Sequence, residues 1–171
     1  FRSRLGSERL HFYAGAEGWL DADAAMLNTE AIASANWHAT AAMAAKQLGE
    51  ALLVDIGSTT CDIIPLSGHA VATHSASDSD RLESGELVYS GVVRTPVMAL
   101  ASEAPVAGRW TPLMAEHFAT SADLYRLLGW LPEAADQHDS ADNGPKTIAA
   151  SQIRLARMVG RDAEQLTPAA W

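Results

Sequence analysis

The sequence predicts a mixed α/β domain, and three observations lead to that class. Short β-rich segments are separated by turn residues, longer segments carry apolar residues at helical spacing, and no segment is repeated. The chain of 171 residues is also long enough to bury a core. We therefore expect a single domain over residues 1–171, built from strands and flanking helices.

Five segments are expected to be strands, because short apolar runs end there at glycine or polar turn residues. They are LHFYAG at 10–15, ALLVDI at 51–56, CDIIPL at 61–66, AVATHS at 70–75 and ELVYSGVV at 86–93. The run at 51–56 is apolar almost throughout, which is typical of a buried strand. Since only short connections, such as the turn SGH at 67–69, separate the three strands between 51 and 75, we expect an antiparallel meander.

Helices are expected where apolar residues recur every three or four positions. Residues 29–48 are alanine-rich, and their helix begins at Thr29 or as late as Ser34 and stops before Gly49. The other expected helices are 96–103 after Pro96, 113–118, 121–129 with Ser121 as N-cap, and 146–160 before Gly160. The polar stretches at 77–86, 108–112 and 131–145 are expected to be loops, and the last is long enough to form a site or a lid.

Charge and composition exclude several classes of partner. The net charge of −9 argues against an electrostatic grip on nucleic acid or on an anionic membrane. No apolar run approaches the roughly 20 residues of a membrane span. The single cysteine, Cys61, permits no internal disulfide, and a reducing cytoplasmic location follows as an expectation. The sequence leaves oligomer formation open.

Residues 54–66 read VDIGSTTCDIIPL, so small polar residues interrupt good strand material. Gly57 lets the backbone approach a ligand closely. Hydroxyls that can donate to an oxyanion follow at Ser58, Thr59 and Thr60. Asp55 at a strand end needs a cation, a hydrogen-bond donor or a reactive water. These parts suit a phosphate cradle with a metal-orienting carboxylate, and they suit equally a hairpin in which the side chains satisfy the turn.

The pattern Asp-x-Gly-x-Thr-Thr-x-Asp at 55–62 resembles the phosphate loop of the actin-like ATPase superfamily, in the version of the hydantoinase/oxoprolinase family. The resemblance implies a ribonuclease-H-like lobe, with a nucleotide and its metal held between two such lobes. Cys61 stands where this loop often has threonine, and we expect it to pack with little effect. The family also carries an earlier Asp-x-Gly-Gly loop. The chain is therefore expected to be a fragment that lacks the N-terminal lobe.

Four blocks, one of which contains this loop, resemble one branch of that family over about residues 9 to 160. They are VDIGSTTCDIIPL, RLESGELVYSGVVRTPVMAL, GRWTPLMAEHFATSADLYRLLG and ADNGPKT. The branch accompanies tetrahydromethanopterin-linked one-carbon transfer and is similar to the enzymes that build the methanofuran core. The resemblance implies a transferase that joins a furanmethanol diphosphate to a tyramine-derived phenol and releases pyrophosphate. The alternatives are an ATP-dependent hydrolase of the hydantoinase/oxoprolinase type and a lobe without catalytic activity.

The resemblance assigns roles to the residues of the loop. Asp55 is expected to orient a divalent metal such as Mg²⁺ and to be catalytic. Phosphate-binding roles, for a phosphorylated small-molecule substrate or for ATP, are expected of Gly57, Ser58, Thr59, Thr60 and Asp62. Asp62 is as well suited to be a structural partner of the turn.

Other candidate residues lie outside the loop. Arg94 follows a predicted strand and could clamp an anion or pair with a nearby acid. Glu86 could serve as the base that accepts the phenol proton, or could simply be solvated. His117 and His138 each lie near acidic residues, as a metal site would require, although the spacing matches no zinc motif. Lys146 at a helix start indicates a ligand or a carboxylate close by.

Overall fold

The computed structural model describes residues 10–33, 35–73 and 77–166. The chain divides into two compact units, the first made of residues 1–55 and 62–88 and the second of residues 56–61 and 89–171. Within the described ranges, no helix combines the length and the apolar character that crossing a bilayer requires. The organisation of both units as one lobe stays a prediction.

The first unit begins with a small hairpin. β1 (His11–Tyr13) pairs antiparallel with β2 (Trp19–Asp21), and the 3₁₀ turn η2 (Gly15–Glu17) connects them. The Asp21 carboxylate then caps α2 (Ala22–Leu27) by accepting bonds from two backbone N–H groups of its first turn, at 2.9 and 2.8 Å. The strand expected at 10–15 is confirmed at its centre.

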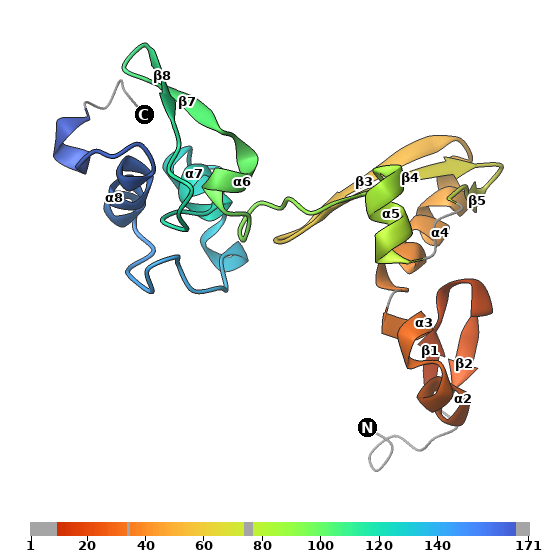
Figure 1. The fold of residues 1–171 in the computed structure, drawn as a ribbon. Helices are drawn as coiled ribbons and strands as arrows, with labels where there is room; N and C mark the ends of the chain where they lie inside the picture. The colour runs from red at the N-terminus through yellow and green to blue at the C-terminus, as the bar shows by residue number, and fades with distance from the viewer. Residues whose placement is uncertain (1–9, 34, 74–76, 167–171) are drawn as a thin grey trace. The chain divides into compact units, whose positions relative to one another are not determined.

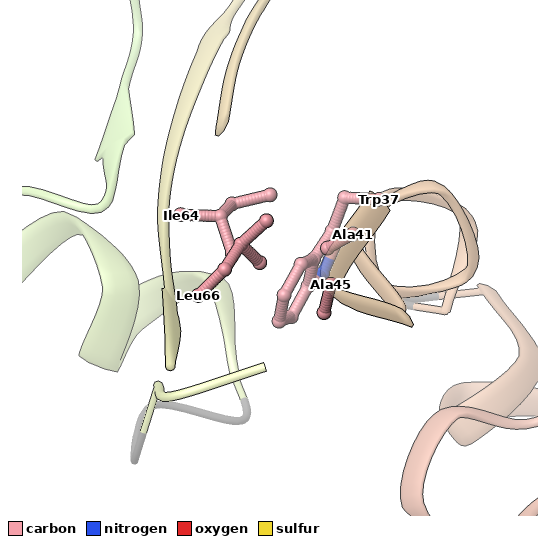
Figure 2. Packing of buried hydrophobic residues seen from close by; sticks show 5 residues of the cluster. All are labelled: Trp37, Ala41, Ala45, Ile64 and Leu66. Atoms are coloured by element: carbon pink, nitrogen blue, oxygen red, sulfur yellow. The ribbon is translucent and has the colours of Figure 1, made fainter. Parts of the chain in front are cut away.

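The alanine-rich segment forms two helices rather than one. α3 (Thr29–Ala33) is followed by α4 (Asn36–Leu48), which ends at Gly49 as expected. Gly49 has a φ of 74°, a conformation that glycine adopts without steric cost. Trp37, Ala41 and Ala45 share one face of α4 because their spacing of four matches the helical repeat. Figure 2 shows this face directed at Ile64 and Leu66, and the five residues form the core of the unit.

Within the described residues, the sheet beside α4 has four strands, and Figure 1 labels three of them, β3, β4 and β5. The four strands are β3 (Ala51–Ile56), β4 (Cys61–Ser67), β5 (Ala70–Val71) and β6 (Leu87–Val88). β4 pairs with β3 and β6, and it pairs antiparallel with β5 in the register Leu66↔Val71. The order β3-β4-β5 and the antiparallel pairing of β4 with β5 are compatible with the expected antiparallel meander, which stays a prediction. β5 ends at Val71, and residues 74–75 of the strand expected at 70–75 lie outside the described residues.

β3 is a strand, but the prediction that it is buried is wrong. Leu53 packs on the core under α4, whereas Leu52, Val54 and Ile56 are 61%, 49% and 60% exposed. Successive side chains of a strand point to opposite faces, so only one face of β3 is covered. A continuous apolar run cannot reveal this, because it reports the composition of both faces and not what packs on them.

The expected loop at 77–86 contains a helix, α5 (Asp78–Ser84). Ser77 and Asp80 form a reciprocal capping box at its start, which the polar composition of the segment concealed. Arg81 of α5 is 1% exposed. Its Nη2 donates to Oδ1 of Asp62 at 2.6 Å, and its guanidinium lies 3.9 Å from the centre of the Trp37 ring.

The second unit packs helices beside a hairpin (Figure 1). Its elements are α6 (Val97–Leu100), β7 (Glu103–Val106), β8 (Arg109–Pro112), α7 (Ser121–Leu127), η3 (Glu133–Ala135), α8 (Ile148–Met158) and η4 (Ala163–Gln165). Val97, Ala119, Leu155 and Met158 form a core between α6, α7 and α8. The long loop before α8 and the end of α8 near Gly160 agree with expectation. The helix expected over 96–103 forms only as α6, and Glu103 begins β7 instead.

Three predictions in this unit are wrong. Most of the loop expected at 108–112 is a strand, because β8 pairs with β7 across the tight turn at Ala107 and Gly108. Residues 113–118 are not helical. The N-cap of α7 is Thr120 rather than Ser121, and it forms a capping box with Asp123. The residues at 109–112 form a strand because they pair with β7. Thr120 is the N-cap because it forms a reciprocal capping box with Asp123.

Candidate functional site

The loop between β3 and β4 is a tight turn that is tied to a second segment. The Gly57 N–H donates to the Thr60 carbonyl at 2.8 Å and closes the turn. The Gly57 carbonyl in turn accepts the N–H of Val92 at 3.0 Å. Both contacts lie within the second unit. The turn is therefore fixed by its own backbone and by residues that follow β6.

Ser58 is the main anchor between these two segments. Its carbonyl accepts the N–H groups of Val93 at 3.1 Å and Arg94 at 2.9 Å. These bonds explain why the strand expected over 86–93 ends at Val88: the later backbone groups bind the loop instead of a sheet neighbour. Within the described residues, the N–H groups of Ser58 and Thr59 have no acceptor. They are the donors that an oxyanion could use.

The Arg94 side chain lies beside the hydroxyls of the loop. Its Nη1 donates to Oγ1 of Thr59 at 3.4 Å, and the hydroxyls of Ser58 and Thr59 are also 3.4 Å apart. Arg94 is exposed, so its remaining donors are open to a ligand. The structure thus brings together one cation and two hydroxyls that the sequence analysis had assigned to anion binding.

Gly91 lies directly against the backbone of the loop. The sequence analysis did not identify this residue. A Cβ at this position would lie 2.5 Å from backbone atoms of Ser58 and Thr59. The hydroxyl of Thr95 accepts the Gly91 N–H at 2.8 Å, and the Ser121 hydroxyl donates to its carbonyl at 2.7 Å. The only sequence signal was the Ser-Gly pair at 90–91 inside a predicted strand, which is typical of a close backbone approach.

A polar cavity of about 300 Å³, here called the first cavity, opens beside Arg94 in the second unit. Arg94, His117 and His138 all line it, although they come from three separate segments. The wall is completed by polar residues of α7 and the following loop. These include Thr120, Asp123, Arg126, Asp136, Asp139 and Ser140. Three of the predicted site residues thus share one cavity.

A buried ion network includes Asp123, Arg126 and Asp136 from the wall of the first cavity. Oδ1 of Asp123 accepts bonds from the Ser151 hydroxyl at 2.7 Å and from Nε of Arg154 at 2.9 Å. Arg126 lies 3.3 Å from the same oxygen and also pairs with Asp136. Burial disfavours the Arg154 cation, but the hydrogen bond and charge of Asp123 outweigh burial and raise the pKa of Arg154. Asp123 and Asp136 are therefore neutralised by arginines.

Arg154 also fixes the long loop before α8. Its Nη1 donates to Oδ1 of Asp142 at 3.0 Å, and both terminal nitrogens lie 3.2 Å from the Pro145 carbonyl. Burial raises the pKa of Asp142, but the Gly144 N–H and Arg154 outweigh burial and lower it. The carboxylate expected near Lys146 is that of Asp136. Nζ of Lys146 lies 3.5 Å from Oδ1 of Asp136.

The remaining predicted residues belong to the first unit. Asp55 is exposed near the end of β3. Asp62 pairs with Arg81 of α5 rather than with the turn. Glu86 accepts a hydrogen bond from the Thr73 hydroxyl. Catalytic or ligand-binding roles for these three carboxylates stay predictions.

The donor set limits the kind of metal site that fits. Across the described residues, no three His, Cys, Asp or Glu side chains are grouped so as to hold a metal ion. Mg²⁺ commonly uses one or two carboxylates together with substrate phosphates and water. A single carboxylate such as Asp55 fits that mode. The metal roles of Asp55, His117 and His138 stay predictions.

The comparison with protein families identifies the class of protein. The hydantoinase/oxoprolinase family model matches residues 2–165, which is nearly the whole chain. The chain belongs to the hydantoinase/oxoprolinase family. Its mixed α/β architecture with antiparallel strand pairs is compatible with a lobe of that family.

Two curated proteins are similar to this chain, and both carry the name (4-{4-[2-(gamma-L-glutamylamino)ethyl]phenoxymethyl}furan-2-yl)methanamine synthase. The protein from Methanocaldococcus jannaschii is 36% identical over 149 residues, which cover 86% of this chain and 45% of that protein. The protein from Methanococcus vannielii is 33% identical over 116 residues, which cover 68% and 52%. The chain spans about half the length of the curated relatives it matches.

Proposed function

We propose that this chain carries part of a synthase of methanofuran-type cofactor formation. The reaction is a transfer in which a phenol oxygen of a γ-glutamyltyramine-type acceptor replaces the diphosphate of an aminomethyl-furanmethanol diphosphate. The two synthases that match 86% and 68% of the chain support this proposal by name. The observation that carries it is the loop at 57–60, whose unused N–H groups and hydroxyls lie beside Arg94.

The loop and Arg94 supply what a diphosphate leaving group needs. Diphosphate departs readily only when its growing negative charge is neutralised. The N–H groups of Ser58 and Thr59 would donate to the phosphate oxygens, and the Arg94 guanidinium would add a charge-assisted pair. Since three backbone bonds from Val92, Val93 and Arg94 fix the loop, these donors are already oriented before the ligand arrives.

The first cavity suits the organic part of the donor. Asp123 and Asp136 are paired with arginines, whereas Asp139 forms no ion pair within the described residues. Asp139 could therefore hold the ammonium group of an aminomethyl furan while Arg94 holds the diphosphate. Both residues line the same cavity, so the two charges of one small ligand would meet both.

The bond changes of the reaction are simple. The phenol oxygen forms a bond to the methylene carbon of the donor, and the bond from that carbon to the diphosphate oxygen breaks. Diphosphate leaves with the bonding electron pair, and the phenol proton passes to a base. Glu86 remains the base that the sequence predicts, and His117 and His138 in the first cavity are further proton acceptors. Asp55 is the residue that would hold a Mg²⁺ ion, whose charge would help to neutralise the leaving diphosphate.

The test is turnover by the 171-residue chain. The chain would be incubated with Mg²⁺, the aminomethyl-furanmethanol diphosphate and γ-L-glutamyltyramine, with pyrophosphate release and the mass of the ether product as readouts. We expect both products, and we expect Asp55→Asn and Arg94→Met each to lower the rate by about 10²–10³-fold. The matched control is Lys46→Met, which changes an exposed lysine of α4 in the first unit.

Other outcomes of the same test would contradict the proposal. A fully active Asp55→Asn variant would remove Asp55 from the mechanism. ATP turnover that depends on a cyclic amide would favour the ATP-dependent hydrolase. If neither reaction occurs and neither pyrophosphate nor ATP binds, the chain is a lobe without catalytic activity of its own.

A further inference from the structure

A second cavity lies next to the first and belongs to no role assigned so far. It has a volume of about 520 Å³ and is lined by residues of α7, η3 and the start of α8. Arg126 and Asp136 line both cavities, so the two spaces share one wall. A ligand in the second cavity would therefore lie close to a donor bound in the first.

The charges around the second cavity are balanced. Arg126 and Lys146 contribute two cations, and Glu133 and Asp136 contribute two carboxylates. Asp136 is already occupied, because Arg126 pairs with one of its oxygens and Lys146 lies 3.5 Å from the other. Glu133 is exposed and forms no ion pair within the described residues, so its carboxylate can bind a ligand. Lys146 offers an N–H donor as well.

The Lys146 ammonium group contacts Asp136 twice but still has an N–H donor for a ligand. Its Nζ donates to the Asp136 carbonyl at 3.1 Å in addition to the ion pair with the Asp136 carboxylate. An ammonium group has three donors, so one is left. Because the side chain is already fixed on two sides, little further conformational entropy is lost when the third donor binds a ligand.

We propose that the second cavity binds the free amino-acid end of a γ-glutamyl compound. Lys146 would bind the α-carboxylate and Glu133 the α-ammonium, so that a zwitterion matches the balanced charges. Leu131 and Ile148 line the same cavity and would contact the carbon chain of the ligand. This inference rests on the proposed function, since the name of both similar synthases contains a γ-glutamylamino group.

The shared wall gives the proposal a functional consequence. The acceptor's amino-acid end would be held in the second cavity, while its phenol ring extends past Arg126 and Asp136 toward the first. The two cavities would thus hold the acceptor and the donor separately and direct their reacting ends toward each other. Recognition of the γ-glutamyl end would distinguish the correct acceptor from simple phenols.

The experiment is isothermal titration of the full 171-residue chain without any diphosphate. The probes are γ-L-glutamyltyramine, its α-N-acetyl derivative and N-acetyltyramine, which lacks the amino-acid end. The variants are Lys146→Met, Lys146→Arg and Glu133→Gln, with Lys46→Met as the matched control. Circular dichroism confirms that each variant is folded, because Lys146 also contacts Asp136.

We expect Lys146→Met to weaken γ-L-glutamyltyramine binding by about tenfold or more and Lys146→Arg to restore most of the affinity. Glu133→Gln should weaken the same probe but leave the α-N-acetyl derivative unchanged, since that derivative has no ammonium group. N-acetyltyramine should bind all variants equally. The control variant should match the wild type with every probe.

The proposal is overturned if Lys146→Met binds γ-L-glutamyltyramine as well as the wild type does. It is equally overturned if the chain does not prefer this probe over N-acetyltyramine, or does not bind it at all. A separate titration with pyrophosphate reports on the proposed function. If pyrophosphate binding fails while recognition of the amino-acid end persists, the proposed transferase reaction is wrong and the γ-glutamyl site stands.

Discussion

Replacing Gly91 by alanine should disrupt the loop at 57–60, because the added methyl group has no room beside the loop backbone. The new Cβ would lie 2.5 Å from the Ser58 carbonyl carbon and the Thr59 nitrogen and 2.6 Å from the Gly57 carbonyl oxygen. All three atoms belong to the backbone, so no side-chain rotation can relieve the clash. The loop must move away, and its three hydrogen bonds to residues 92–94 then lengthen or break.

The size of the effect follows from two costs. Overpacking a well-packed site costs about 1–3 kcal/mol, and each weakened hydrogen bond costs roughly 0.5–1.5 kcal/mol. Since the shift relieves part of the clash at the expense of the bonds, we expect a loss of about 2–4 kcal/mol in the free energy of unfolding. That loss corresponds to a fall in Tm of about 4–16 °C for a chain of this length.

The assay combines thermal unfolding with pyrophosphate titration of the folded variant at low temperature. Gly108→Ala is the matched control, because the same methyl group would meet nothing within 4 Å there, although φ at Gly108 is +77°. The control should lose about 1–2 kcal/mol from backbone strain alone and bind pyrophosphate normally. The reasoning is refuted if Gly91→Ala keeps both wild-type stability and wild-type pyrophosphate affinity.

Two further predictions concern stability. Arg154→Met should lower the free energy of unfolding by about 3–5 kcal/mol, because the buried Asp123 carboxylate then loses one of its paired cations. Urea unfolding measures this loss. A loss below about 1 kcal/mol would contradict a stabilising role for the Asp123–Arg154 pair. Burial lowers the pKa of His38 in the folded protein. The unfolded chain therefore binds protons first as the pH falls below about 6.5, and stability decreases through that range. His38→Gln should lose this part of the pH dependence in thermal unfolding, and an unchanged profile would contradict it.

Most elements with a clear local signal could be predicted from the sequence. The face of α4 was readable because Trp37, Ala41 and Ala45 recur every four residues, and Gly49 marked its end. The helix α5 was not recognised, because its only start signal was the capping box of Ser77 in an otherwise polar stretch. β8 could not be recognised either, because a strand of four residues depends on its partner β7.

The candidate site was predictable only in part, because contacts between distant segments of the chain place several of its residues. The loop was visible as a motif, and Arg94 was proposed for its position after a strand. Its position beside Thr59 depends on backbone bonds between segments more than 30 residues apart. The same holds for Gly91, whose importance is a matter of distance to the loop rather than of its own conformation. His117 and His138 share a cavity with Arg94 only because the second unit packs their three segments together. The sequence alone does not show this packing.

The central claim is that the loop at 57–60 and Arg94 hold a diphosphate. The most direct test is isothermal titration of the chain with pyrophosphate and, separately, with ATP, each in the presence of Mg²⁺. Arg94→Met and the control Lys46→Met would be titrated alongside. We expect pyrophosphate to bind more tightly than ATP, and Arg94→Met to weaken pyrophosphate binding by about tenfold or more, with no change for the control. Preferential binding of ATP, or pyrophosphate binding that is unaffected by Arg94→Met, would contradict it.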